Sequence, residues 1–429
     1  MKLFERLFKH ITLAFLLCFF APSTASSPNN EPTLQADSIE ISLLTCGPRQ
    51  QVYSLYGHTA IRFQDKQSGR DIAINYGVFS FDQPFFVLRF VFGLTDYEMG
   101  IAPFDIFEWE YGPTGCGVRQ QVLNLTAQEK MAIAQAVDRN MEPQNRVYRY
   151  NFFYDNCTTR ARDIIANNLN GRIVYDSSTP QHLNTSTPQH HNTPAQYPTF
   201  RNLIHNYNET HRWARFGNDL LLGVKADYNT TFEQQQFLPE RLCADFERAH
   251  IISTDGTKRN LVSSSFWLFE PTTKQQSTQQ TNMSILDIFS PLVTFSILSI
   301  LTLIIAIVEY RRKRIIWVFD TSLMLTTGAC GLLLFAMIFS QHPTVSLNLQ
   351  ILLLNPINIF MLYSVTKAAR QNRIHWWTKA WSALILLLLA GSFLQSYAEG
   401  ITIVALSLLL RNISNIYTLK NTGSKQPEA

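Results

Sequence analysis

Five apolar runs near the C-terminus constrain the fold of this chain more than any other feature. They cover residues 288–308, 315–339, 347–366, 380–397 and 400–418. Each is close to the ~20 residues that a helix needs to cross the hydrocarbon core of a bilayer. Inside lipid the backbone must satisfy its own hydrogen bonds, so such segments have to be helical. The sequence therefore predicts an all-α transmembrane domain of five helices over residues 288–418, with Arg411 and Asn412 interrupting the fifth run.

The charges between these runs orient the predicted domain. The loops 340–346 and 398–400 carry neither Lys nor Arg. Basic residues instead follow the first, third and fifth runs: Arg311, Arg312, Lys313, Arg314, Lys367, Arg370, Arg373, Lys379, Lys420 and Lys425. Basic loops are retained on the cytoplasmic side of a membrane. We therefore expect a cytoplasmic tail at residues 419–429 and an exported segment before residue 288.

Residues 1–25 have the pattern of a secretory signal peptide, which agrees with that orientation. Three basic residues precede an apolar stretch at 11–21, and small residues at 23–25 offer a cleavage site. An uncleaved anchor is the alternative, and it exports the following segment equally. An oxidising compartment permits a bridge such as Cys46 to Cys116, although spacing does not fix the pairing.

Residues 26–271 combine strand and helix patterns, and they predict an α+β domain. Alternating apolar and β-branched residues predict strands at 39–44, 58–63, 72–79, 118–125 and 261–269. Helical spacing and caps predict helices at 126–141, 200–222 and 237–252.

Two stretches of the exported part have a biased composition. Residues 177–198 are rich in Thr, Pro, Gln, Asn and His, and they predict a flexible insertion. Residues 272–287 predict a linker to the transmembrane domain. We expect no metal site, because no cysteines and histidines have zinc-like spacing.

Cys157 is the candidate nucleophile. It follows Asp155 and Asn156, either of which is a suitable helix N-cap, and the residues after it repeat apolar side chains at helical spacing. A cysteine in the first helical turn feels the positive end of the helix dipole, which lowers the pKa of its thiol. The alternative is a buried structural cysteine.

A nucleophilic cysteine needs a base, and the base needs a group that orients it. Among the exported histidines, His58 has the best setting, because it opens a predicted strand directly after Gly57. Asn75 lies on the neighbouring strand of the presumed hairpin and is the candidate orienting residue. The backbone N–H of Cys157 can serve as an oxyanion donor. This set predicts a thiol acyltransferase or hydrolase that passes through a thioester.

A short apolar stretch at residues 85–94 is the candidate lipid contact. Its aromatic side chains are Phe85, Phe86, Phe90 and Phe92, and it is too short to span a bilayer. One interpretation is a core helix. The other is a segment that enters the outer leaflet or covers an acyl chain.

Polar residues inside the apolar runs also need a partner, because they are costly in hydrocarbon. Asp320 lies near the expected cytoplasmic interface, and the third run contains Asn348, Gln350, Asn355 and Asn358. Asp320 is therefore expected to be hydrated at that interface, whereas the four amide side chains of the third run either hydrogen-bond between helices or line a lipid or substrate groove.

The order of the site residues resembles a known group. A histidine that precedes an Asn-Cys pair at a helix start resembles the circularly permuted NlpC/P60 (papain-like) group, which includes lecithin–retinol acyltransferase-like enzymes. Over nearly its full mature length, the chain is similar to the Lnb-type lipoprotein N-acyltransferases. The resemblance rests on residues 43–46, 56–62, 75–77, 152–160 and 216–223, and on the membrane positions Asp320, Gly328, Gly331, His342, Pro343, Asn348, Asn355 and Pro356. The insertion at 177–198 matches nothing in this pattern.

The resemblance implies transfer of a fatty acyl group from a membrane phospholipid to the N-terminal amine of a diacylglyceryl-cysteine lipoprotein. It implies Cys157 as the nucleophile that carries the acyl group as a thioester, His58 as the general base, and no cofactor. It also implies a multi-pass protein of the bacterial inner membrane whose permuted NlpC/P60-like catalytic domain faces the periplasm.

Three other functions remain open at this point. A cell-wall amidase or peptidase of NlpC/P60 type has the same dyad but needs neither the membrane spans nor the apolar stretch. A thiol phospholipase or thioesterase shares the first step and uses water as the acceptor. A non-enzymatic scaffold would use Cys157 structurally. Nucleic-acid binding is not expected, because the net charge is only +4 and no basic patch carries base-stacking aromatics.

Overall fold

The computed structural model of the chain describes residues 36–49, 51, 54–79, 84–176, 197–272 and 289–423. The predicted signal peptide (1–25), most of the predicted insertion (177–196), most of the predicted linker (273–287) and the last residues of the predicted tail (424–429) lie outside the described residues.

An antiparallel sheet of seven strands organises the exported domain. Its strand order is β10-β5-β1-β2-β3-β4-β6, and every neighbouring pair is antiparallel. The strands are β1 (Ile39–Cys46), β2 (His58–Asp65), β3 (Arg70–Val78), β4 (Asp96–Pro103), β5 (Val118–Leu123), β6 (Val147–Arg149) and β10 (Val262–Phe269). A second sheet has three strands, β7 (Gly171–Val174), β8 (His250–Ser253) and β9 (Lys258–Asn260). The predicted strands are therefore present, with shifted ends.

Helices connect these strands. The α-helices of the exported part are α2 (Phe86–Val91), α3 (Phe104–Tyr111), α4 (Ala127–Met141), α5 (Pro143–Arg146), α6 (Cys157–Ala166), α7 (Phe200–Asn208), α8 (Arg212–Leu221), α9 (Phe232–Gln235) and α10 (Pro239–Arg248). Short 3-10 helices are η1 (Ala36–Ser38), η3 (Gly112–Thr114) and η4 (Val224–Asp227). The predicted helix at 200–222 is wrong as a single element, because the chain turns at residues 209–211 between α7 and α8.

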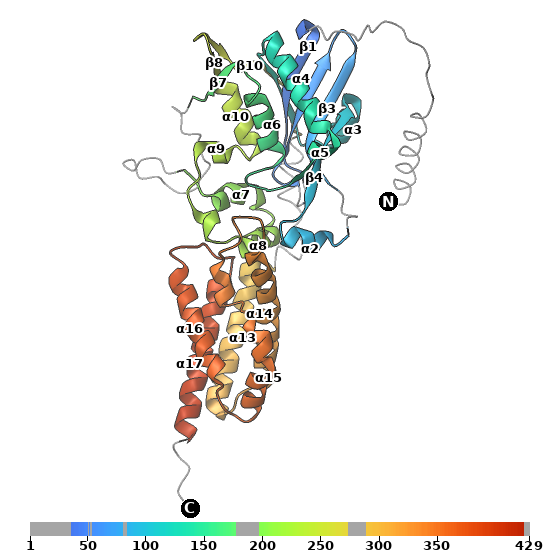
Figure 1. Ribbon diagram of the computed structural model, residues 1–429. Coiled ribbons are helices and arrows are strands. Elements are labelled where there is room, and N and C mark those ends of the chain that lie inside the picture. Colours follow the sequence, from blue (N-terminus) through green and yellow to red (C-terminus); the bar gives the residue numbers. More distant parts are fainter. Residues whose placement is uncertain are drawn as a thin grey trace, which may run out of the picture. The chain divides into compact units, whose positions relative to one another are not determined.

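The alternation of side chains along the strands builds a core on each face of the large sheet. Ile61 and Phe63 of β2 face a core shared with α4, α6 and α10, whereas Ala60 faces the aromatic side chains of α3. Figure 1 shows α6 and α10 on the other side of this sheet from α3. Full burial of one such side chain contributes about 1.5–3 kcal/mol. The two cores fix the ends of β2 and α6, which is where the site is built.

Apolar helices make up the C-terminal part. Among the described residues, four helical segments are long and apolar enough to cross a membrane, and the apolar helix α16 is shorter. The α-helices are α13 (Pro291–Arg312), α14 (Trp317–Ile338), α15 (Ile357–Arg370), α16 (Trp376–Gly391) and α17 (Ile401–Gly423), and η5 (Leu349–Leu352) precedes α15. The predicted all-α class of the membrane domain is therefore confirmed. The number of times that the chain crosses the membrane stays a prediction. Helix α17 continues beyond residue 418, where the last run was expected to end.

The polar residues of this domain make hydrogen bonds between segments. Asn358 donates to Thr327 Oγ1 (2.9 Å) and accepts from Trp377 Nε1 (2.8 Å), which links α15 to α14 and α16. Arg411 explains the interruption of the fifth run: it forms ion pairs with Glu309 of α13 and Asp320 of α14. The hydrogen-bonding interpretation therefore holds for these side chains.

Segment 216–223 connects the exported domain to the loops of the membrane domain. Asn348 and Gln350 donate to the carbonyl oxygens of Leu220 and Asp219 at 2.8 and 2.9 Å. Gly223 donates its N–H to the Thr344 carbonyl oxygen at 2.8 Å. A Cβ at Gly223 would lie 2.0 Å from the Leu347 carbonyl oxygen, so only glycine permits this close approach.

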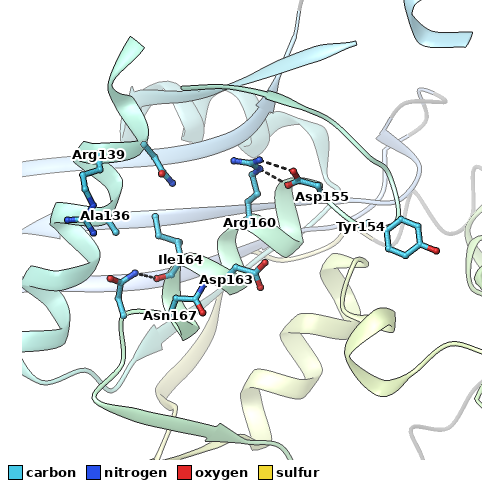
Figure 2. Close-up of a pocket in the computed structure, with 10 residues that line it drawn as sticks. Ala136, Arg139, Tyr154, Asp155, Arg160, Asp163, Ile164 and Asn167 are labelled. Carbon is cyan, nitrogen blue, oxygen red and sulfur yellow. Dashed lines mark hydrogen bonds and ion pairs between the residues drawn. The ribbon is translucent and has the colours of Figure 1, made fainter. Parts of the chain in front are cut away.

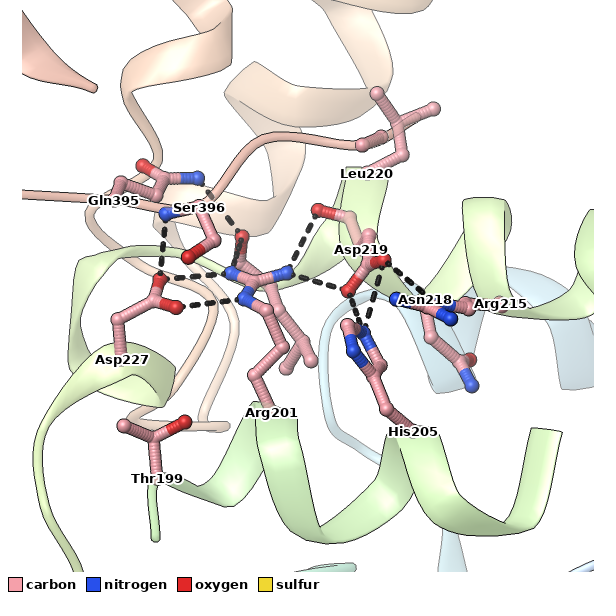
Figure 3. A network of polar contacts seen from close by, with 12 residues as sticks. Thr199, Arg201, His205, Arg215, Asn218, Asp219, Leu220, Asp227, Gln395 and Ser396 are labelled. Carbon is pink, nitrogen blue, oxygen red and sulfur yellow. Dashed lines mark hydrogen bonds and ion pairs between the residues drawn. The ribbon is translucent and has the colours of Figure 1, made fainter. Parts of the chain in front are cut away.

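A buried arginine fixes this junction from the exported side (Figure 3). Arg201 of α7 pairs with Asp219 of α8 (2.7 Å) and with Asp227 of η4 (2.8 Å), and its side chain is 1% exposed. Gln395, in the loop after α16, donates to the Leu222 carbonyl oxygen at 3.0 Å. The helices α7 and α8 are thus tied to each other and to the membrane domain.

Candidate active site

One pocket of about 340 Å³ contains Cys157, His58 and Asn75. Cys157 opens α6, and His58 opens β2 directly after Gly57. Gly57 has φ +77°, and a Cβ there would lie 2.6 Å from the Cys46 carbonyl oxygen. Glycine is therefore required for the tight turn that leads into His58. The structure brings the three residues together from three separate elements.

Asn156 is the N-cap of α6, as one of the two sequence alternatives predicted. Its Oδ1 accepts from the N–H groups of Thr158 and Thr159, both at 2.9 Å. Its Nδ2 donates to the carbonyl oxygens of Phe152 and Phe237, so the cap is fixed on both sides. The N–H of Cys157, at the first helical position, has no partner within the helix. It is available to a negatively charged oxygen at the pocket.

His58 forms a hydrogen bond with Asn75. Its Nε2 lies 3.0 Å from Asn75 Oδ1. The register pairs Asn75 with Ala60, two residues along β2 from His58, so both side chains lie on one face of the sheet. Because a carbonyl oxygen only accepts, Nε2 carries the proton that it donates. The other ring nitrogen, Nδ1, is left for the Cys157 thiol.

The thiol and the imidazole stabilise each other's charged form. Burial raises the pKa of Cys157, but the positive charge of His58 and hydrogen bonds from His58 and the Thr59 N–H outweigh it, so this pKa is lowered. Burial lowers the pKa of His58, but the Cys157 thiolate and the bonds to Cys157 and Asn75 outweigh it, so this pKa is raised. Both shifts favour a thiolate–imidazolium pair, the reactive form of a thiol nucleophile.

The rest of the pocket is aromatic, with one charged pair. The ring of Tyr111 stacks on that of His58, with centroids 6.4 Å apart and an interplanar angle of 13°. Tyr76, Phe79, Tyr97 and Tyr150 also line the pocket, and Arg49 and Glu110 add opposite charges. Sequence reasoning missed Arg49, Glu110 and Tyr111. Arg49 lies in the loop after β1, and Glu110 and Tyr111 lie at the end of α3. No sequence motif marks either segment as a neighbour of His58.

Of the four phenylalanines of the candidate lipid contact, Phe85, Phe90 and Phe92 have described side chains, and these three do not line this pocket. Phe85 precedes α2 and is 78% exposed, and Phe90 is 47% exposed. The core-helix interpretation of this stretch is therefore wrong, because α2 has only six residues and its described apolar side chains lie largely outside a core. The Phe92 carbonyl oxygen accepts from the Gln341 N–H at 3.0 Å, three residues after α14 ends. The side chain of Phe86 lies outside the described part of the chain.

A second pocket, of about 510 Å³, lies between α4 and α6 (Figure 2). It is polar, and it contains none of the predicted site residues. Arg160 binds Asp155 through two bonds of 2.6 and 2.8 Å and lies 3.5 Å from the centre of the Tyr148 ring. These contacts support the start of α6, and hence the position of Cys157.

The cysteines of the described residues are all free thiols, so the Cys46–Cys116 bridge considered from the sequence is not formed. Over the described ranges, no group of three or more His, Cys, Asp or Glu side chains is arranged to hold a metal ion. The histidines of the predicted insertion lie outside those ranges.

Comparison with protein families identifies both halves of the chain. The family model of the Lnb N-terminal periplasmic domain matches residues 27–203, which include His58, Asn75 and Cys157. The family model of the Lnb transmembrane domain matches residues 280–422. The chain belongs to the Lnb family of lipoprotein N-acyltransferases. No curated protein and no solved structure matches it.

Membership of the Lnb family confirms the family predicted from the sequence, as well as its order of domains. The protein therefore has a periplasmic mixed α/β domain followed by a helical transmembrane domain, and it is an inner-membrane protein of a family that acts in lipoprotein maturation. The structure adds the residue-level geometry of the pocket in the Lnb N-terminal domain.

Proposed function

We propose that this Lnb-family protein transfers a fatty acyl group from a membrane phospholipid, through a thioester on Cys157, to the N-terminal amine of diacylglyceryl-cysteine lipoproteins. One observation carries the proposal. Cys157, His58 and Asn75 share a pocket in a periplasmic domain that is fused to membrane helices. Both proposed substrates reside in the bilayer, so a thiol site held at the membrane can reach both.

In the first half-reaction, the Cys157 thiolate attacks an ester carbonyl of the phospholipid. A C–S bond forms, the carbonyl electrons move to the oxygen, and the Cys157 N–H stabilises the resulting oxyanion. The C–O bond then breaks, and the His58 imidazolium gives its proton to the leaving lysophospholipid alkoxide. The product is an acyl thioester on Cys157 beside a neutral His58.

In the second half-reaction, the amine of the lipoprotein cysteine attacks the thioester, and neutral His58 acts as the general base that takes a proton from the nitrogen. The C–S bond breaks and an amide forms, which restores the thiolate–imidazolium pair. The aromatic side chains that line the pocket limit the access of water, and this favours aminolysis over hydrolysis.

Helix α2 is the proposed membrane contact of the periplasmic domain. Phe85, Leu88 and Phe90 are 78%, 55% and 47% exposed. The hydrogen bond from Gln341 to Phe92 holds α2 beside the end of α14, where a membrane helix leaves the bilayer. A short apolar helix at that level can insert into the outer leaflet. We infer that Phe85, Phe86, Phe90 and Phe92 contact acyl chains there.

The test is expression in a strain that lacks its own lipoprotein N-acyltransferase, followed by mass spectrometry of lipoprotein N-termini. We expect triacylated lipoproteins with the wild type and with Cys330→Ala, whose thiol lies in α14 away from the pocket. With Cys157→Ala we expect only diacylated lipoproteins.

Two outcomes contradict the proposal. Diacylated lipoproteins in cells that express the folded wild type would exclude N-acyl transfer. Release of free fatty acid without N-acylation would identify a phospholipase that uses the same first half-reaction. Cleavage of cell-wall peptides would instead support the amidase alternative.

A further inference from the structure

We propose that Arg49 binds the phosphodiester of the acyl donor and thereby selects phospholipids over other esters. This inference rests on the proposed function, because it assigns a donor-reading group to the same pocket. Apart from the Cys157–His58 pair, Arg49 and Glu110 are the charged side chains that line this pocket. Arg49 is therefore the one fixed positive charge beside the nucleophile, within the described lining.

The Arg49 guanidinium is held in place by an aromatic ring. It lies 3.9 Å from the centre of the Tyr111 ring, and Tyr111 stacks on His58. The Arg49 side chain is only 19% exposed. A stacked, largely buried guanidinium loses little conformational freedom when it binds a ligand. Tyr111 thus sets Arg49 at a fixed position relative to the catalytic imidazole.

Glu110, the ion-pair partner of Arg49, forms only long hydrogen bonds with the guanidinium N–H groups. Both Nη1 and Nη2 lie 3.4 Å from the same oxygen of Glu110, whose side chain is 56% exposed. In contrast, Arg62 binds the two oxygens of Asp71 at 2.9 and 2.6 Å in the same sheet. A further neighbour of Arg49 is the Cys116 thiol, which is a weak acceptor.

A phosphodiester can replace this contact at low cost. The Glu110 side of this pair is 56% exposed, and ion pairs that reach solvent contribute about 0.2–1 kcal/mol; the Arg49–Glu110 distance of 3.4 Å is long even for such a pair. Two anionic oxygens of a phosphodiester match the planar fork of a guanidinium and form charge-assisted bonds. In a phospholipid the phosphate is attached to the glycerol that bears the scissile ester, so it lies near the carbonyl that Cys157 attacks.

The chemistry of the acceptor explains why such selection is needed. A diacylglyceryl-cysteine lipoprotein also carries two acyl esters on a glycerol, but it has no phosphate there. A thiol pocket that recognised only acyl chains would attack the acceptor's own esters. A guanidinium that binds a phosphodiester favours the phospholipid donor over the lipoprotein acceptor, because only the donor carries a phosphate on its glycerol. The acyl chains of the two molecules are alike and cannot provide this selectivity.

The experiment compares two donors that differ in the phosphate. The purified full chain in mixed micelles is given either dioctanoyl phosphatidylglycerol or dioctanoylglycerol, without acceptor, and acyl-Cys157 formation is followed by mass spectrometry. The measured quantity is the ratio of the two rates at low donor concentration. We expect the wild type to favour the phospholipid, and Arg49→Gln to reduce the ratio roughly 10- to 100-fold through lost charge-assisted hydrogen bonds.

Two further variants separate phosphate binding from a structural role. Arg49→Lys retains the charge and should keep part of the preference. Glu110→Gln removes the counter-ion, and its donor ratio should not fall. If Arg49 served only to form the ion pair, Glu110→Gln would reduce the ratio as Arg49→Gln does, and that result would overturn the inference.

The outcomes also distinguish this inference from the proposed function. An equal loss with both donors in Arg49→Gln would mean that Arg49 acts on the thiol or the fold, and it would overturn the inference alone. Failure of the wild type to acylate Cys157 with either donor would instead refute the proposed function. Inhibition by inorganic phosphate at the concentration of the phospholipid would show a general phosphate site and contradict selection of a lipid phosphodiester.

Discussion

In the proposed mechanism, the reactivity of Cys157 depends on the different partners of the two ring nitrogens of His58. Nε2 is engaged with Asn75 Oδ1 at 3.0 Å, which leaves Nδ1 for Cys157. The same arrangement lowers the pKa of the thiol and raises that of the imidazole. The reactive ion pair exists between these two pKa values, above that of Cys157 and below that of His58. Acyl-enzyme formation should therefore follow a bell-shaped pH profile.

Asn75→Ala should move one limb of that profile. Asn75 raises the pKa of His58. Its removal lets the imidazolium lose its proton at lower pH, so we expect the alkaline limb to shift to lower pH and the acid limb to move less. The maximum should fall about tenfold or more, because one charge-assisted hydrogen bond of ~1.5–3 kcal/mol is lost. Single-turnover acylation measured against pH tests this.

Asn75→Asp is the matched control, because it keeps an acceptor and adds a negative charge. Its alkaline limb should shift to higher pH, opposite to that of Asn75→Ala. An alkaline limb that does not move in Asn75→Ala would show that Asn75 does not act on His58.

The candidate residues themselves could be predicted from the sequence. Only some of the residues that surround them in the pocket could be predicted in the same way. The glycine before His58, the helix start at Cys157 and the hairpin position of Asn75 are local patterns, and the structure places all three residues in one pocket. Arg49 and Glu110 are 61 residues apart and belong to no motif. Their meeting depends on the register of β1 and on the packing of α3, which local patterns do not encode.

Among the elements, α2 exposes apolar side chains, and we propose that it contacts the membrane through them. Leu88→Asp places a charge on its exposed apolar surface, where Leu88 is 55% exposed. If α2 inserts in lipid, the variant loses roughly the ~1.5–3 kcal/mol of one buried leucine, or about 10- to 100-fold in apparent affinity for donor in vesicles. Donor dispersed in detergent should react almost normally, and the Tm should hardly change.

Val174→Asp on β7 is the control for α2, because Val174 is also exposed (36%) but lies in the small sheet. It should leave the use of vesicle donor unaltered. Equal effects of both variants, or no effect of Leu88→Asp on vesicle donor, would remove the membrane role of α2.

The junction of α7 and α8 depends on the buried Arg201. Arg201→Met leaves the Asp219 and Asp227 carboxylates without their buried partner, because Arg201 is 1% exposed. Breaking a buried pair in this way costs about 3–5 kcal/mol of the free energy of unfolding. We expect a clearly lower Tm in detergent.

Arg215→Met serves as the matched control. Arg215 also approaches Asp219, but at 3.9 Å and with 39% of its side chain exposed. The free energy of unfolding should change by less than about 1 kcal/mol. Similar losses in both variants would show that the Arg201 network is not the main tie at this junction.

Apolar periodicity alone could not predict this junction. The pattern from residue 200 to 222 continues through the break between α7 and α8, so it predicted one helix. The partners of Arg201 lie 18 and 26 residues further along the chain. By contrast, the capping box at Thr126 is a local pattern, and α4 begins at the next residue, one position after the predicted start at residue 126.

In the whole molecule, the number of membrane crossings decides on which side of the membrane the C-terminus lies relative to the periplasmic domain. We propose that the chain crosses the bilayer five times, with α16 as the shortest span, and that the C-terminus is cytoplasmic. Fusions to green fluorescent protein and to alkaline phosphatase at residue 429 test this. We expect fluorescence and no phosphatase activity, because the first matures in the cytoplasm and the second only after export. The opposite pattern would require an even number of spans after the periplasmic domain.

In the proposed reaction Cys157 carries the acyl group, and this intermediate can be trapped. The purified full chain is incubated with a phospholipid that has a labelled acyl chain, without acceptor, and the peptide that contains Cys157 is analysed by mass spectrometry. We predict one acyl adduct on Cys157, which neutral hydroxylamine removes and which a diacylglyceryl-cysteine peptide accepts as an N-terminal amide. N-acylation that proceeds with no adduct on Cys157, or that persists in Cys157→Ala, would show that Cys157 does not carry the acyl group.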